Sequence, residues 1–189
     1  MKKTKKAKAG MKILDGTERK AILIGAQEVF FMGMLLGYAG GKRRKSPTGT
    51  RVKVTKTRWR KTVSMWIGHF KMVDEWLVTN GQSDASAGTT TIFFKLESWS
   101  GWLPVWRMSY QGSYPKEVIP FLKEVLCKAY QSKLFRGGRG PFRVKSEKLF
   151  VYFNLGETAD FSDFYGHEYI EDAQCKKVGQ HDYMGMSLI

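Results

Sequence analysis

The stretch RVKVTKT at Arg51–Thr57 changes side-chain character from one residue to the next, which is the period of a β-strand. Three further runs, HFKMVDEWLVT, TTTIFFKLE and LPVWRMSYQG, follow it within residues 69–112 and are rich in β-branched and aromatic side chains. Three more strand-like runs, LFVYFNL, FYGHEYIE and HDYMGMSLI, lie within residues 149–189. The chain from residue 51 onward is therefore predicted to consist mainly of β-strands.

Two segments have helical spacing instead. In Thr17–Leu36 apolar residues recur every three to four positions, and Asp15 followed by Glu18 resembles a capping box at the start of a helix. Gly37 is placed to end this helix, and the glycines inside it indicate the close approach of another element. Residues Val118–Tyr130 form the second predicted helix.

Strands that occur in runs, separated by two helices, predict an α+β fold with a mostly antiparallel sheet of about six to seven strands. A length of 189 residues fits one domain with a core of its own. We expect this domain to span residues 13–189. Residues 1–12 are rich in lysine and have no large apolar cluster to bury, so they are predicted to form a disordered basic arm.

Basic residues dominate the composition and gather in the first third of the chain. The formal net charge is +15, and Lys42–Lys61 contains ten basic residues and no carboxylate. Such an excess attracts polyanions, so nucleic acid is one expected partner, bound mainly through its phosphates. Trp59 lies between two arginines and could stack on a base. The candidate contact residues are Lys42, Arg43, Arg44, Lys45, Arg51, Arg58, Trp59 and Arg60.

The apolar segment Ala21–Gly41 is nearly long enough to cross a membrane, but Gln27 and Glu28 interrupt it, which favours a soluble amphipathic helix. No signal peptide is predicted, because Glu28 breaks the apolar run and no small-residue cleavage site follows. Cys127 and Cys175 have no C-x-x-C spacing and form no disulfide framework. We therefore expect a cytoplasmic protein without a membrane span.

A series of short motifs has the order found in a known family. The motifs are YAGG, FKMVDEW, PVWRMSYQG, FLKEVL, RGGRGPF, FSDFYGHEYI and HDYMGMSL. Over residues 30–189 this order resembles the bacterial family catalogued as domain of unknown function 5680. The family has no assigned activity, but some members look like the C-terminal partner of a helix-turn-helix DNA-binding domain, which implies sensing or regulation. The family-like residues are Asp74, Trp106, Tyr110, Gly112, Arg139, Gly140, Pro141, Phe161, Gly166 and Glu168, whereas Trp76 and Ser109 depart from the family pattern.

The glycine-rich segment KLFRGGRGPF, Lys133–Phe142, invites comparison with a phosphate-binding loop or an RNA-binding Arg-Gly box. A phosphate-binding loop follows a strand and opens a helix, whereas this segment follows a predicted helix and precedes a strand. A single copy flanked by large apolar residues is poor evidence for an Arg-Gly box. We interpret the segment as a turn in which Gly137 and Gly138 end the helix.

No catalytic or metal-binding motif is recognised. The three histidines lack zinc-ligand spacing, and no nucleophile elbow or paired-cysteine motif is present, so we assign no catalytic residue, metal or cofactor. Polar and aromatic residues on predicted strands could nevertheless line a ligand pocket. An ion pair between Glu168 and Arg139 would be a structural explanation for two of them. The candidate pocket residues are Asp74, Trp106, Tyr110, Arg139, Glu168 and His181.

Three functions follow from these patterns. The first is a nucleic-acid-associated or regulatory protein that contacts phosphate through residues 42–61. The second is a sensing domain in which the aromatic pocket binds a small molecule or a protein partner. The third, ranked last, is a small enzyme that uses Asp74, Arg139 and Glu168. The sequence does not determine the ligand or the oligomeric state.

Overall fold

A computed structural model describes residues 14–40, 48–77, 84–97, 101–136, 140, 143–145, 150–156 and 160–189. In chain order its elements are α1 (Gly16–Leu36), β1 (Arg51–Lys56), β2 (Arg60–Ile67), β3 (Phe70–Leu77), β4 (Ala85–Phe94), β5 (Leu103–Ser113), α2 (Ile119–Gln131), β6 (Arg143–Lys145), β7 (Val151–Gly156), β8 (Asp163–Glu171) and β9 (Lys177–Ser187).

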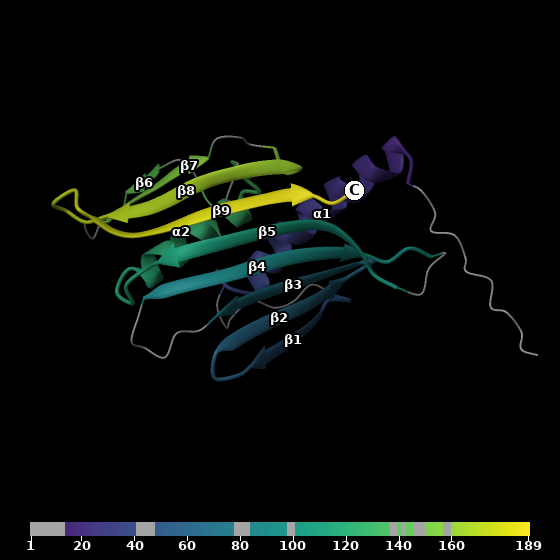
Figure 1. The fold of residues 1–189 in the computed structure, drawn as a ribbon, viewed down its shortest axis with the longest axis horizontal. Helices are drawn as coiled ribbons and strands as arrows, with labels where there is room; N and C mark the ends of the chain where they lie inside the picture. The colour runs from purple at the N-terminus through teal and green to yellow at the C-terminus, as the bar shows by residue number, and fades with distance from the viewer. Residues whose placement is uncertain are drawn as a thin grey trace, which may run out of the picture.

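The described strands form one sheet of nine strands in the order β1-β2-β3-β4-β5-β9-β8-β7-β6, and every neighbouring pair is antiparallel (Figure 1). Strands β1–β5 form a meander, α2 carries the chain to the far edge, and β6–β9 return so that β9 pairs with β5 in the middle of the sheet. The α+β class with two helices is confirmed.

The predicted number of six to seven strands was too low, because β2 and β6 were not foreseen. The turn between β1 and β2 contains neither glycine nor proline, so the sequence of this basic segment gave no sign of a turn. The hydroxyl of Thr57 closes this turn by accepting a 3.1 Å hydrogen bond from the amide of Arg60. Strand β6 has only three residues, which is too few for a periodic pattern.

Helix α1 begins with the predicted capping box. The Asp15 carboxylate accepts from the amide of Glu18 at 2.8 Å, and the Glu18 carboxylate accepts from the amide of Asp15 at 3.1 Å. Both helices cover the same face of the sheet (Figure 1). A side chain at Gly33 would collide with Met72 of β3, which confirms the predicted close approach of another element.

An aromatic cluster joins α1 to the middle of the sheet. Phe30 of α1 is fully buried, and the centre of its ring lies 5.2 Å from that of Trp106 on β5. The indole of Trp106 stacks on Phe161 at 4.5 Å and donates a 2.7 Å hydrogen bond to the carbonyl of Phe161. Trp106 is thus a core residue whose polar nitrogen is satisfied. Within the described residues, no helix is both long and apolar enough to span a membrane.

Side chains alternate between two faces along every strand. The face toward the helices, which we call the inner face, holds the core and the buried polar residues. The opposite, outer face carries most of the charged side chains of the strands. The register of neighbouring strands assigns each described candidate residue on a strand to one of the two faces.

Candidate functional site

A row of cationic and aromatic side chains crosses the outer face of β1–β4. Arg51, Trp66, Lys71 and Phe93 are successive cross-strand neighbours in the sheet register. The guanidinium carbon of Arg51 lies 5.2 Å from the centre of the Trp66 ring, and the Lys71 ammonium lies 5.6 Å from it. The same ammonium lies 5.7 Å from the centre of the Phe93 ring. These distances are within the range of cation–π attraction.

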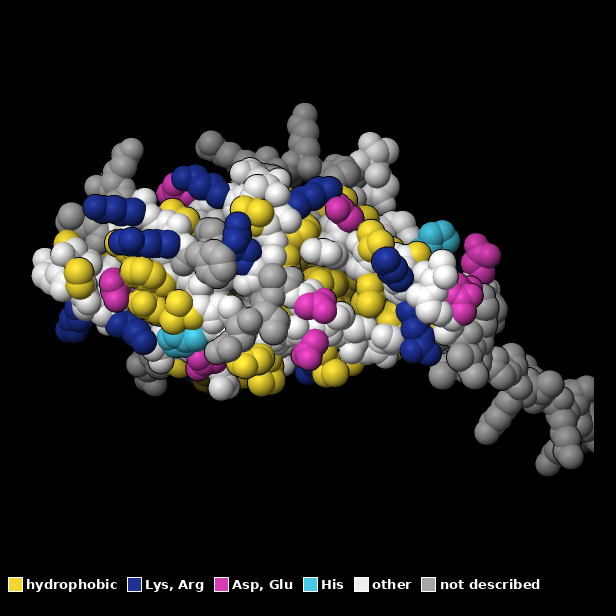
Figure 2. Space-filling view, turned by 90° about the horizontal axis from the view of Figure 1, so that it is seen from above, with side chains coloured by type: hydrophobic (Ala, Val, Ile, Leu, Met, Phe, Trp, Pro, Cys, Tyr) yellow, Lys and Arg dark blue, Asp and Glu magenta, His cyan; other side chains and the backbone are white. Residues whose placement is uncertain are grey.

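Charge is unevenly distributed over the outer face. On β1–β5 the described outer-face residues include five bases and one acid, namely Arg51, Lys53, Arg60, Lys71, Arg107 and Glu75. On β6–β9 they include three bases and three acids, namely Arg143, Lys145, Lys177, Asp163, Glu171 and Asp182. We call the β1–β5 set together with Trp66 and Phe93 the basic outer surface. Figure 2 views the molecule from above Figure 1, toward the edge of the sheet that β6–β8 form. Basic, acidic and hydrophobic side chains are mixed on this side of the molecule.

The one acid of the basic outer surface is largely neutralised by its neighbours. The Glu75 carboxylate lies 3.5 Å from the Arg60 guanidinium and accepts a 3.1 Å hydrogen bond from Thr62. Lys53 and Arg107 are exposed. The positive charge of this surface is therefore directed toward solvent.

The predicted nucleic-acid contacts fall into three groups. Arg51 and Arg60 belong to the basic outer surface. Arg58 and Trp59 lie on the β1–β2 turn, where the guanidinium carbon is 4.6 Å from the centre of an indole that is 51% exposed. Trp59 is therefore open to solvent beside the guanidinium group of Arg58. Lys42, Arg43, Arg44 and Lys45 lie outside the described residues.

Sequence reasoning did not single out Trp66, Lys71 or Phe93. These three residues lie on three different strands, and only the strand register shows that they are neighbours. The alternation of side chains along each strand could have placed these residues on one face. To use this alternation, the start of β2 had to be known, and β2 was not predicted.

The inner face carries a second group of polar residues, which we call the buried polar row. Asp74, Thr90, Asn154, Glu168 and His181 are each at least 96% buried. The Asp74 carboxylate accepts a 2.9 Å hydrogen bond from Thr90 and a 3.5 Å bond from the hydroxyl of Tyr110. Hydrogen bonds of this kind offset the cost of removing polar groups from water.

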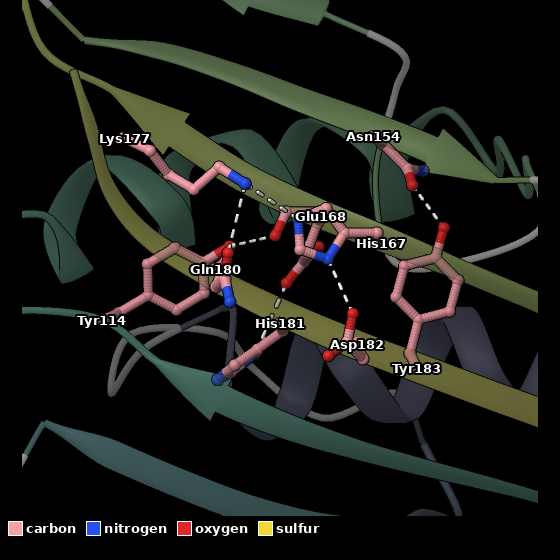
Figure 3. A network of polar contacts seen from close by, with 9 residues as sticks. All are labelled: Tyr114, Asn154, His167, Glu168, Lys177, Gln180, His181, Asp182 and Tyr183. Carbon is pink, nitrogen blue, oxygen red and sulfur yellow. Dashed lines mark hydrogen bonds and ion pairs between the residues drawn. The ribbon is translucent and has the colours of Figure 1, made fainter.

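Two tyrosine rings that donate hydrogen bonds to the buried polar row lie across glycines of neighbouring strands. A side chain at Gly88 would collide with the Tyr110 ring, which reaches over β4 toward Asp74. In the same way the Tyr183 ring lies over Gly166. Its hydroxyl donates a hydrogen bond to the side-chain oxygen Oδ1 of Asn154 on β7 (Figure 3). The absence of a side chain at each glycine lets a ring lie flat on the sheet.

Glu168 is fully buried. One carboxylate oxygen accepts a 2.6 Å hydrogen bond from the Tyr152 hydroxyl. The other lies 3.5 Å from Nδ1 of His181 (Figure 3). The other ring nitrogen of His181 lies 2.8 Å from the Ser86 hydroxyl. The row therefore connects β4, β9, β8 and β7 by direct polar contacts.

Four of the predicted pocket residues follow one another in a series of contacts along the inner face and do not gather around one point. Asp74 on β3 and Glu168 on β8 are separated by four strand spacings, roughly 19 Å along the sheet. Trp106 belongs to the aromatic core, whereas Tyr110 and His181 lie between the two carboxylates, with ring centres 6.0 Å apart. Arg139 lies outside the described residues. Two carboxylates this far apart cannot act on one reacting bond.

A histidine–carboxylate pair also lies on the outer face of β8–β9. Nδ1 of His167 is 2.7 Å from the Asp182 carboxylate, and Nε2 is 3.5 Å from the Lys177 ammonium (Figure 3). His167 and Asp182 are direct cross-strand neighbours. The described residues contain no group of three or more His, Cys, Asp or Glu side chains that could hold a metal ion.

Comparison of the chain with protein-family models, with curated proteins and with solved structures found no match. The function is therefore inferred from the basic outer surface and the buried polar row.

Proposed function

We propose that this protein binds single-stranded nucleic acid through the basic outer surface, mainly by contacts to phosphate. The observation that supports this proposal best is the charge asymmetry of one continuous sheet face. Five bases and one acid lie on β1–β5, whereas the remainder of the described outer face is balanced. A balanced surface would serve solubility equally well, so the segregation of charge indicates an anionic partner.

The aromatic rings within this surface favour single strands over duplexes. Bases of a single strand can stack on aromatic rings and on arginine planes while neighbouring cations bind phosphates. Arg51, Trp66, Lys71 and Phe93 supply both kinds of group in one row of the sheet. In a duplex the bases are already stacked, so only the phosphate contacts remain. Trp59 and Arg58 on the adjoining turn extend the same combination.

We interpret the buried polar row as a structural feature that stabilises the sheet. Its carboxylates are enclosed and hydrogen-bonded to neighbouring strands, and its two acids are too far apart for shared chemistry. The resemblance to the bacterial family of unknown function stays a prediction, and the regulatory role that it implies is compatible with nucleic-acid binding.

The proposal is tested with a matched pair of double variants. Lys53→Gln/Arg107→Gln removes one lysine and one arginine from the basic outer surface, and Arg143→Gln/Lys145→Gln removes the same charges from the opposite end of the same face. Binding of a fluorescent single-stranded oligonucleotide is measured by anisotropy. The proposal predicts a clear loss of affinity for the first variant and little change for the second. Equal losses would show that only net charge matters and would overturn it.

A further inference from the structure

Two lysines and two aromatic rings form a separate cluster at the β2–β3 end of the inner face. The Lys61 ammonium of β2 lies 4.9 Å from the centre of the Trp76 ring on β3, and the Lys123 ammonium of α2 lies 4.9 Å from the centre of the Tyr38 ring. The Tyr38 and Trp76 rings meet edge to face at 6.0 Å. Four segments of the chain thus bring two ammonium groups together around one pair of rings.

The electrostatics of this cluster are unfavourable to its two cations. Burial lowers the pKa of Lys123, and the nearby charge of Lys61 lowers it further. Among the described residues neither ammonium forms an ion pair with a carboxylate. Cation–π contacts offset part of this cost but do not neutralise the charge. Two partly buried cations in one place are stabilised most effectively by an anion between them.

Three acids lie on β3 and α2, the elements that carry Trp76 and Lys123, and all three are engaged elsewhere. Asp74 accepts from Thr90 on the inner face, Glu75 points to the outer face toward Arg60, and Glu124 pairs with Lys128 at 2.7 Å. The described residues therefore supply no ion pair to either ammonium group of the cluster.

We propose that Lys61 and Lys123 form a binding site for the phosphate group of a small ligand. The two ammonium groups would each donate to phosphate oxygens, and Trp76 and Tyr38 would shield these bonds from water. Charge-assisted hydrogen bonds of this kind are about twice as strong as neutral ones. The site lies on the inner face and is distinct from the basic outer surface, so it does not rest on the proposed nucleic-acid function.

The same phosphate chemistry could come from a small molecule or from a nucleic-acid backbone, and two probes separate these sources. Inorganic pyrophosphate is titrated into the protein by calorimetry at low ionic strength, and a single-stranded oligonucleotide is titrated in parallel. Pyrophosphate binding that is unchanged in Lys53→Gln/Arg107→Gln supports a separate site. Pyrophosphate binding that is lost in this outer-surface variant overturns the proposal.

Conservative variants test the two lysines. Lys61→Met and Lys123→Met keep the apolar stems on the rings but remove the charge, and each is expected to weaken pyrophosphate binding about tenfold or more, the loss expected for a charged hydrogen bond. Lys128→Met, an exposed change on the same helix, is the control and is expected to change affinity less than about twofold. Lys61→Arg and Lys123→Arg keep the charge and are expected to retain binding.

The thermal unfolding midpoint of each variant shows whether it is folded, and the Lys61 variants test the site on their own if a Lys123 variant does not fold. No pyrophosphate binding by the unmodified protein, or equal losses in the Lys61, Lys123 and Lys128 variants, would overturn the proposal.

Discussion

Arg51 and Trp66 face each other across the β1–β2 pair, with the guanidinium carbon 5.2 Å from the centre of the indole ring. Lys71 approaches the same ring from β3. The ring is therefore held between cations contributed by both neighbouring strands. This relationship defines the middle of the basic outer surface and makes Trp66, rather than the more exposed Trp59, the central aromatic residue of the proposed interface.

Trp66→Ala is expected to weaken binding of a single-stranded oligonucleotide by about 1–3 kcal/mol, because one base loses its stacking partner. Trp66→Tyr should retain most of the affinity, since a ring remains at the position. Trp59→Ala, on the turn, is expected to cost less. Fluorescence anisotropy measures all three, and circular dichroism checks the fold. Equal affinities for Trp66→Ala and the unmodified protein would exclude stacking on this ring.

Gly88→Ala is expected to destabilise the protein by about 1–3 kcal/mol. The added methyl group would meet the Tyr110 ring and the carbonyl of Glu75, so the ring or the strand must move. Gly16→Ala is the matched control, because nothing lies near that position and alanine is favoured in a helix. Urea unfolding should show a loss of stability for Gly88→Ala and none for Gly16→Ala. Similar stability of both variants would mean that Tyr110 does not lie against Gly88.

Strands β8 and β9 carry two histidine–carboxylate pairs at successive positions, one buried and one exposed. Glu168→Gln disrupts the buried pair with His181 and is expected to cost about 2–4 kcal/mol of unfolding free energy. Asp182→Asn disrupts the exposed pair with His167 and should cost less than about 1 kcal/mol. Equal costs in denaturant unfolding would contradict the description of Glu168 as part of a buried structural network. Neither change should alter oligonucleotide affinity.

The lowered pKa of Lys123 has a consequence for stability at alkaline pH. Its pKa in the folded protein lies below the ordinary value of 10.5, so between these two values the unfolded chain binds more protons. The unfolding free energy contributed by this group therefore rises with pH in that interval. The stability of the unmodified protein relative to Lys123→Met should increase as pH approaches 10.5. A difference that is constant with pH would contradict the burial of this ammonium.

Local patterns in the sequence predicted much of the fold. The capping box at Asp15 and Glu18 is a short-range signal, and the observed hydrogen bonds match it. The alternation in Arg51–Thr57 likewise coincides with β1. Strand β2 was missed because its turn is closed by the Thr57 side chain and not by glycine or proline. A hydroxyl that closes a turn leaves no distinctive composition in the sequence.

The candidate surface depended on long-range pairing, which a single sequence does not contain. The position of Arg51 in the basic segment was visible, but its neighbour Trp66 follows only from the β1–β2 register. Similarly, Asp74 and Glu168 looked equivalent as strand carboxylates, and only the strand order places three strands between them. A one-residue change of register would have moved Trp66 to the other face.

The salt dependence of single-stranded oligonucleotide binding tests the central claim most directly. The association constant is measured by anisotropy between low and moderate salt for the unmodified chain and for Lys53→Gln/Arg107→Gln. A variant with glutamine at the six lysines of residues 1–12 provides the control for the basic arm. The account predicts a log–log slope of about −2 or steeper, which corresponds to about three neutralised phosphates, and a shallower slope only for the outer-surface variant. A slope near zero, or one that changes only when the lysines of residues 1–12 are replaced, would contradict it.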